Sequence, residues 1–155
     1  MTKLNRKIEY SLMALQYIQQ RQPSSKVTAK EVSDSVQAPF DVIARVMQIM
    51  AQKGLLISEQ GASGGYRLNQ DLKNVSLFQL FEMIEGPTAL VKCISEDGVC
   101  DNETSCNVAS PLKSLNTKLN TFFKNIPLSE LLAGEDSAAD SITTNGERAK
   151  DLNHV

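Results

Sequence analysis

The sequence predicts a mainly α-helical fold with one small β-hairpin. Several segments repeat apolar residues every three or four positions, which is the spacing of a helix with one buried face. Two of these segments open with the capping-box pattern that marks a helix start. Two short extended runs, "LLIS" and "YRL", are joined by the glycine-rich "EQGASGG", as in a β-hairpin. The 155 residues suffice for one compact core with an extension and are too few for two large domains.

The first predicted helix covers residues 4–20, and "PSS" at residues 23–25 ends it. Its apolar residues keep helical spacing at Ile8, Leu12, Leu15 and Ile18. A second helix begins at Thr28, because the Thr28 hydroxyl can cap the Glu31 amide while the Glu31 carboxylate caps the Thr28 amide. This helix runs to about Val36.

A third helix is predicted over residues 39–51, with Pro39 in its first turn and Gly54 as its C-terminal stop. Its predicted buried stripe consists of Ile43, Val46, Met47 and Met50. Its predicted outward face consists of Asp41, Ala44, Arg45 and Gln48. The hairpin runs follow this helix. Helix, turn, helix and β-hairpin, in this order, is the arrangement of a winged helix-turn-helix.

Two further helices are predicted beyond the hairpin. In "SLFQLFEMIEGP", Ser76 and Gln79 form the second capping box, and Gly86-Pro87 is the stop. The last helix starts at Ser110 and Pro111, and its apolar residues alternate spacings of three and four at Leu112, Leu115, Leu119, Phe122 and Ile126. A seam of about two heptads is too short to be stable alone in water. The helix therefore packs on its own domain or pairs with a second copy, and we predict the pairing.

Composition and charge indicate a soluble cytoplasmic protein. No apolar run approaches the roughly 20 residues of a membrane span, and the N-terminus has no apolar signal core. The net charge of −2 hides an asymmetry, because residues 1–70 carry an excess of four positive charges and residues 71–155 an excess of six negative ones. Such a positive front half fits a nucleic-acid-binding domain. Residues 134–155 have few large apolar side chains, which predicts a disordered tail.

All the cysteines of the chain lie in "CISEDGVCDNETSC", a short acidic segment from Cys93 to Cys106 that also contains Cys100. Three is an odd number, and a cytosolic setting disfavours structural disulfides, so metal or redox chemistry is the leading interpretation. Three close thiolates on one loop can hold an iron-sulfur cluster. The alternatives are zinc, thiol-disulfide sensing and incidental cysteines. Zinc ligands usually come in pairs spaced by two to four residues, and neither such a pair nor a C-x-x-C motif is present.

The series "LLISEQGASGGYRL", "VSLFQLFEMIEGP", the three cysteines and "LNTFFKNIPLSELL" resembles the iron-sulfur-cluster-sensing winged-helix transcription regulators typified by IscR, NsrR and RirA. The resemblance covers roughly residues 1–133. It implies a homodimer that binds a DNA palindrome. It also implies an iron-sulfur cluster that senses iron, cluster supply, nitric oxide or redox state.

The third helix is the expected DNA-reading element, because the second helix of a helix-turn-helix lies in the major groove. Arg45 can reach guanine or a phosphate, and Gln48 can read adenine, although both also suit an ordinary solvated face. Asp41 caps the helix or contacts DNA, and Tyr66 contacts DNA or packs under the wing. The predicted DNA-binding residues are Thr28, Pro39, Asp41, Arg45, Gln48, Gly64, Gly65, Tyr66 and Arg67.

The fourth cluster ligand rests on the resemblance. Some members have a histidine three residues after the last cysteine, and this sequence has Ala109 there. The one histidine, His154, lies in the predicted tail. Other members supply a carboxylate from the first helix of the partner subunit, and the matching residue is Glu9. The resemblance favours a [4Fe-4S] cluster over a [2Fe-2S] cluster.

These observations predict a DNA-binding repressor and not an enzyme, with no membrane partner and no small-molecule substrate. Its predicted parts are a winged helix-turn-helix domain at 1–87, a cluster-binding loop at 88–109, a dimerisation helix and short terminal helix at 110–133 and the tail. A regulator that senses oxidants directly through its thiols is the alternative. An iron-sulfur electron carrier is a remote one, because no substrate-pocket signature or catalytic constellation is recognisable.

Overall fold

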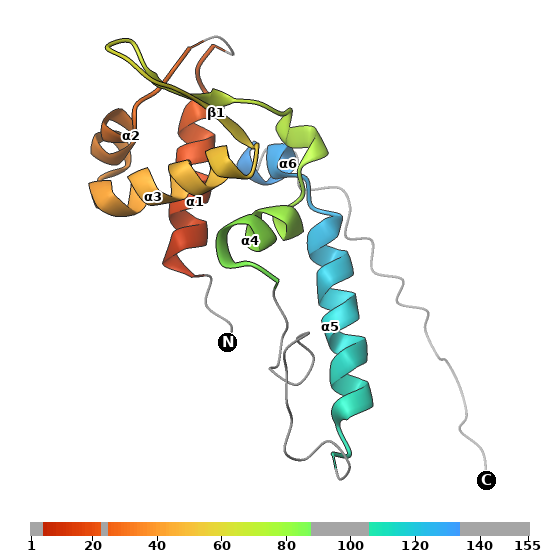
Figure 1. Cartoon of the computed structure of the whole chain (residues 1–155). Helices are drawn as coiled ribbons and strands as arrows, with labels where there is room; N and C mark the ends of the chain where they lie inside the picture. Colours follow the sequence, from red (N-terminus) through yellow and green to blue (C-terminus); the bar gives the residue numbers. More distant parts are fainter. Residues whose placement is uncertain (1–4, 23–24, 88–105, 134–155) are drawn as a thin grey trace, which may run out of the picture.

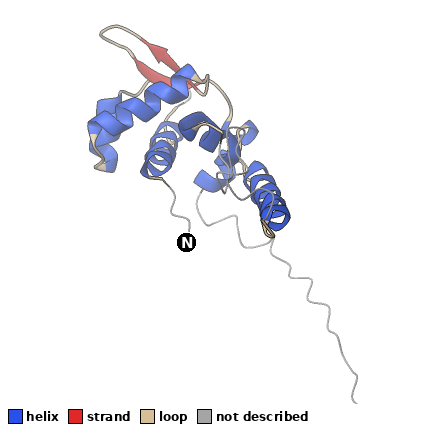
Figure 2. Ribbon diagram, turned by 60° about the horizontal axis from the view of Figure 1, so that its bottom comes forward, coloured by secondary structure: helices blue, strands red, loops and turns tan. Residues whose placement is uncertain are grey.

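The computed structural model describes residues 5–22, 25–87 and 106–133 (Figure 1). The elements, in chain order, are α1 (Arg6–Gln19), α2 (Ala29–Val36), α3 (Phe40–Gln52), β1 (Leu56–Glu59), β2 (Gly65–Leu68), the 3-10 helix η1 (Leu72–Asn74), α4 (Leu77–Glu85), α5 (Ala109–Lys124) and α6 (Leu128–Leu132). The hairpin of β1 and β2 projects from a helical body (Figure 2). The predicted mainly helical fold with one winged helix-turn-helix is therefore confirmed. Most of the cysteine segment and the predicted tail lie outside the described residues.

Both predicted capping boxes are present, and they set where α2 and α4 begin. At α2, the Thr28 hydroxyl accepts a hydrogen bond from the Glu31 amide at 3.2 Å, and the Glu31 carboxylate accepts one from the Thr28 amide at 2.6 Å. The bond that the Thr28 amide donates to the Glu31 carboxylate, and next the one that the Thr28 hydroxyl donates to it, lower the pKa of Glu31 because they stabilise its charged form. At α4, Ser76 and Gln79 exchange the equivalent bonds. Local sequence alone dictates these two helix starts.

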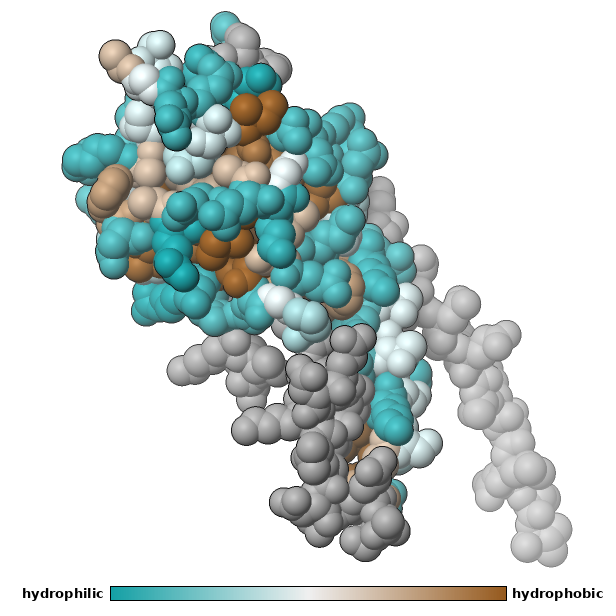
Figure 3. All heavy atoms as spheres, viewed as in Figure 1, coloured by the Kyte–Doolittle hydropathy of each residue, from teal (hydrophilic) through white to brown (hydrophobic). Residues whose placement is uncertain are grey.

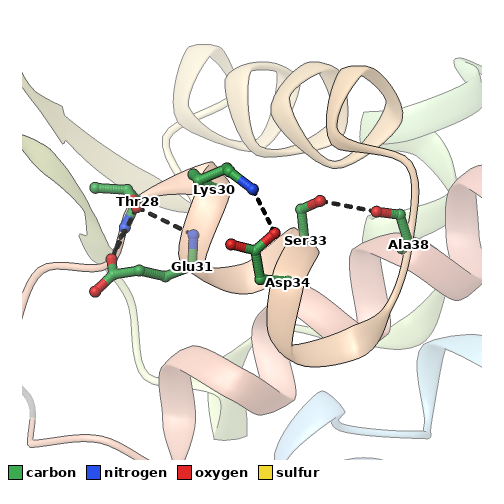
Figure 4. A network of polar contacts seen from close by, with 6 residues as sticks. All are labelled: Thr28, Lys30, Glu31, Ser33, Asp34 and Ala38. Atoms are coloured by element: carbon green, nitrogen blue, oxygen red, sulfur yellow. Dashed lines mark hydrogen bonds and ion pairs between the residues drawn. The ribbon is translucent and has the colours of Figure 1, made fainter.

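The turn between α2 and α3 is tight and held at both ends (Figure 4). Gln37 takes the left-handed conformation, with a φ of 52°, which a residue with a side chain adopts at some cost. The buried Ser33 hydroxyl donates to the Ala38 carbonyl at 2.8 Å, and the Ala38 amide donates to the Ser33 carbonyl at 3.1 Å. This pair of bonds fixes the direction in which α3 leaves the turn.

The core lies between α1, α3 and α4, and the predicted stripes supply it. The four predicted inward residues of α3 are each 1% exposed or less, and Ile8, Leu15 and Ile18 of α1 are also buried. Leu128 of α6 is fully buried in the same core. Two backbone bonds hold it there, from the Leu77 amide to the Ile126 carbonyl and from the Leu128 amide to the Val75 carbonyl, both at 2.8 Å. The chain thus returns to the winged-helix body after α5.

α5 differs from the other long helices because none of its residues is buried. It extends away from the body, with its first turn at the far end from the hairpin (Figure 1). Its last turn contacts α4, where the rings of Phe123 and Phe81 meet edge to face with centroids 5.2 Å apart. Lys124 lies over the ring of Phe78 at 4.6 Å. Among the described helices, none is long and apolar enough to cross a membrane.

Candidate nucleic-acid interface and cysteine loop

The outward face of α3 carries the predicted base-reading residues in an accessible position. Asp41, Arg45 and Gln48 are exposed, and Ala44 is half-buried. Within the described part of the chain, Arg45 forms no ion pair. Its guanidinium is therefore available to a base edge or a phosphate.

The start of α3 is open. Pro39 is the residue before the helix, and no side-chain hydrogen bond caps this end. Asp41 therefore does not cap α3, although its charge in the first turn suits the helix dipole. The Thr28 hydroxyl, by contrast, is already engaged with Glu31 in the capping box of α2.

The wing is the hairpin of β1 and β2, and beside its loop lies a cluster of three charges, which we call the wing triad: Lys26, Glu59 and Arg67. Glu59 lies between the two cations and pairs with both, so the pKa of its carboxyl is lowered, chiefly by the hydrogen bond from Lys26 and next by that from Arg67. Arg67, a predicted DNA contact, is thus already paired within its own chain. The side chains of the triad are 34% to 38% exposed, so solvent and phosphates can both reach them.

Close backbone approach explains why glycines occupy the end of the wing. A Cβ at Gly64 would lie 2.4 Å from the Glu59 carbonyl, and one at Gly65 would lie 2.9 Å from the Val27 carbonyl. Gly65 also has a φ of 156°. Next to it, Tyr66 exchanges two backbone hydrogen bonds with Val27, at 2.8 and 2.9 Å, which tie the wing to the segment before α2. Tyr66 is half-buried and packs against the core, which agrees with the packing alternative for this residue.

The described part of the cysteine loop is its end. Cys106 is a free thiol, half-buried, three residues before α5. Cys93 and Cys100 lie outside the described residues. Within residues 5–22, 25–87 and 106–133, no three cysteine, histidine or acidic side chains form a group that could hold a metal ion. Three thiolates are the donor set that iron-sulfur clusters use, so the chemistry of the loop fits such a group.

Glu9 is half-buried in the first turn of α1. Figure 1 shows the beginning of α1 and the beginning of α5 well separated, with α4 between the two helices. Cys106 is three residues from α5, a length of chain that spans at most about 11 Å. Glu9 and Cys106 thus belong to two separate parts of the described chain, the first turn of α1 and the segment before α5.

The predicted seam on α5 has no cover within the described chain. Leu115 and Phe122 are 44% and 61% exposed, and Leu112 and Leu119 are half-buried. Ile126, the last seam residue, instead packs against the core of the body. The stripe also begins one turn earlier than predicted, because Val108 is 47% exposed and precedes Leu112 by four residues.

Sequence reasoning missed several residues of these surfaces. Phe40, the first residue of α3, is 52% exposed. It directly follows Pro39, a predicted DNA-binding residue, and could have been included for that reason. Val108 continues the spacing of the seam and could have been included on that ground. The pairing of Lys26 with Glu59 could not be predicted from residue types, because it depends on the register of the hairpin and on the bridge between Val27 and Tyr66.

Comparison with known proteins agrees with this geometry. The family described as "Rrf2: Iron-dependent Transcriptional regulator" matches residues 4–134. The HTH-type transcriptional regulator IscR of Vibrio vulnificus (strain YJ016) is 24% identical over 134 residues, which cover 86% of this chain and 79% of that protein.

Two solved structures share the fold. CymR, described as the global cysteine regulator of B. subtilis, superposes with a TM-score of 0.69 at 18% identity, over 88% of this chain and 100% of that one. IscR of T. potens gives a TM-score of 0.64 at 17% identity, over 84% and 86% of the two chains.

The fold, the exposed face of α3 and these relatives define a winged-helix DNA-binding transcriptional regulator, and not an enzyme. The chain belongs to the Rrf2 family. The family resemblance noted in the sequence is thereby confirmed.

Proposed function

We propose that this protein is a homodimeric transcriptional repressor whose DNA affinity is controlled by an iron-sulfur cluster on Cys93, Cys100 and Cys106. The observation that carries the proposal is the uncovered apolar stripe on α5. It begins at Val108, two residues after Cys106, and continues through Phe122 to the contact with α4. One helix thus connects the cysteine loop, a candidate dimer surface and the DNA-binding body.

Dimerisation follows from the energetics of α5. A helix of 16 residues is marginal in water by itself, and within the part of the chain that the structure describes none of the residues of α5 is buried. Its apolar stripe has the alternating spacing of a two-helix seam. A second copy of α5 packed against this stripe would cover the exposed side chains of Leu115 and Phe122. Two copies of α3 would then face successive major grooves of a palindrome.

The proposed DNA surface combines α3 and the wing. Arg45 and Gln48 on α3 are the proposed base-reading residues, with Asp41, Pro39 and Thr28 at the helix starts nearby. Gly64, Gly65, Tyr66 and Arg67 form the wing side, where the backbone approaches phosphate or the minor groove. A dimer bound at a promoter excludes polymerase by occupancy, which is why we propose repression, in the cytoplasm.

The proposed cluster site uses the three loop thiolates of one subunit and Glu9 of the partner subunit. Glu9 is on α1, whose beginning lies apart from the beginning of α5 in Figure 1, which supports a donation across the dimer. A bound cluster would itself respond to oxidants, nitric oxide or iron supply. A carboxylate is a hard, weakly held ligand for such a group, which suits an exchangeable position. By resemblance we favour a [4Fe-4S] cluster.

A second candidate function is direct thiol sensing without a cluster. Cys106 favours it, because a half-buried free thiol is accessible to an oxidant. Anaerobic purification separates the two functions. The cluster proposal expects a visible absorbance band with stoichiometric iron and sulfide, and loss of both in Cys93→Ala, Cys100→Ala and Cys106→Ala. If the purified protein is colourless and iron-free and its DNA binding still changes on oxidation, the cluster proposal fails and direct thiol sensing takes its place.

A further inference from the structure

Phe40 is an aromatic side chain that the fold leaves in water. It is 52% exposed, and it belongs neither to the buried core nor to the half-buried residues that pack against it. Among the described residues, the aromatic ring pairs involve only Phe81, Phe122 and Phe123. Its ring therefore contributes little to the folded state of one chain and is accessible to a partner.

The position of Phe40 is fixed by the turn that precedes it. Phe40 is the first residue of α3. The bond from the Ser33 hydroxyl to the Ala38 carbonyl (Figure 4) and the backbone bond from the Ala38 amide to the Ser33 carbonyl hold the chain just before it. Asp41 and Arg45 are exposed on the turns that follow. A rigid apolar tip thus stands at the start of the DNA-reading helix.

The surroundings point to DNA and not to the dimer surface as its partner. Figure 1 shows that α3 begins beside α2, at the end of the body opposite α5 and its uncovered stripe. On this side of the body Figure 3 shows apolar atoms broken up by hydrophilic ones, whereas the apolar stripe of α5 lies at the other end of the molecule. In a helix-turn-helix, the first residues of the second helix meet the base edges.

We propose that Phe40 reads the methyl group of a thymine in the major groove, an inference that rests on the proposed docking of α3 there. The C5 methyl of thymine is the one apolar group that a base pair presents in this groove, and phenylalanine is among the side chains that contact it. Phe40 would then be a specificity residue that adds apolar readout to the polar readout of Arg45 and Gln48.

The test begins with a duplex that full-length wild-type protein selects from a random-sequence library. Each thymidine of that duplex is replaced in turn by deoxyuridine, which removes the methyl group and keeps the base pair. We expect one thymine in each half-site at which this change weakens wild-type binding about fourfold, the equivalent of about 0.8 kcal/mol for one buried methyl group. The other thymines should show no change.

Phe40→Ala should bind the selected duplex more weakly and should lose the discrimination between thymine and uracil at that position. Phe40→Leu keeps an apolar contact and should retain a preference for thymine. Leu131→Ala, which truncates a similarly exposed apolar side chain on α6, is the matched control and should behave as wild type. Circular dichroism and thermal unfolding confirm that each variant is folded, as the exposure of Phe40 leads us to expect.

Two outcomes overturn the inference while the regulator stands. One is that Phe40→Ala keeps the wild-type ratio of affinities for the thymine and uracil duplexes. The other is that no replacement of thymine by uracil weakens binding by the wild-type protein. If the wild type enriches no sequence at all, both the inference and the proposed operator binding fail. These results are distinguishable because the last one appears before any Phe40 variant is made.

Discussion

Arg67 donates a hydrogen bond from Nε to the Glu59 carboxylate across the hairpin, at 3.3 Å. The two residues are diagonal neighbours, since Arg67 lies opposite Ile57 and Glu59 lies opposite Gly65. The other carboxylate oxygen pairs with Lys26, which precedes the backbone bridge between Val27 and Tyr66. The wing triad therefore holds both cations near a carboxylate that competes with phosphates for them.

Glu59→Gln should strengthen non-specific DNA binding, because it frees Lys26 and Arg67 and removes a charge that repels phosphates. Each additional phosphate contact steepens the dependence of log affinity on log salt by about 0.9. We expect the slope of the variant to be steeper by about 2, which is roughly 0.9 for each of the two freed cations, measured by fluorescence anisotropy on duplex DNA from 50 to 200 mM salt. Glu82→Gln, which makes the same change at an exposed residue of α4, is the control. Weaker binding with a shallower slope would show instead that Glu59 positions the cations for DNA.

The wing triad also gives the protein a pH dependence in the acid range. The folded pKa of Glu59 lies below its ordinary value of 4.5, so the triad stabilises the fold fully above that value and loses this contribution as pH falls through the folded pKa. We expect the melting temperatures of wild type and Glu59→Gln to differ at pH 7 and to converge at acid pH. Thermal melts at a series of pH values measure this. A difference that stays constant down to pH 2 contradicts it.

Leu119→Lys should break the proposed dimer, because it places a charged ammonium group between two apolar stripes. We expect the dimer dissociation constant to rise roughly 100-fold, or about 3 kcal/mol, in sedimentation equilibrium. Affinity for a palindrome should fall with it, since a monomer meets one half-site. Thr117→Lys adds the same charge on the exposed opposite side of α5 and should leave the dimer intact. An unchanged dimer in Leu119→Lys would mean that the seam lies elsewhere.

The sequence predicted what short-range rules determine. The capping boxes at Thr28 and Ser76 and the buried stripe of α3 depend on neighbours within one or two turns, and the structure confirms all three. Gln37 shows the limit of such rules. A left-handed residue in a turn is usually glycine, whereas here the turn at Gln37 is supported by hydrogen bonds between Ser33 and Ala38.

Contacts between residues far apart in the chain could not be predicted from the sequence. The sequence places Leu128 in the short terminal helix. Its full burial in the core depends on the backbone at Val75 and Leu77, which pairs with the chain around it. The pairing of Arg67 with Glu59 likewise depends on a strand register that residue types alone did not specify. The exposure of Phe40 could be known only once the neighbouring helices were in place.

Arg45→Ala distinguishes base reading from phosphate contact. If Arg45 reads a base, specific binding should weaken by about 1 to 3 kcal/mol, and the preference at one operator position should relax. Selection of random-sequence duplexes with wild type and variant measures both effects. Lys113→Ala removes an exposed cation from α5 and should change neither. Uniform weakening across all sequences would assign Arg45 to a phosphate.

Glu9→Ala tests the proposed ligand from the partner subunit. The three thiolates should still hold the cluster, so we expect near-normal iron and sulfide without oxygen, but altered spectra and faster loss under oxygen or nitric oxide. Because Glu9 lies on α1 of the DNA-binding body, its removal should also make cluster-loaded and cluster-free protein bind DNA alike. Glu130→Ala on α6 is the control for loss of an exposed carboxylate. Unchanged spectra, stability and DNA response in Glu9→Ala would make Glu9 a surface residue and place the fourth ligand elsewhere.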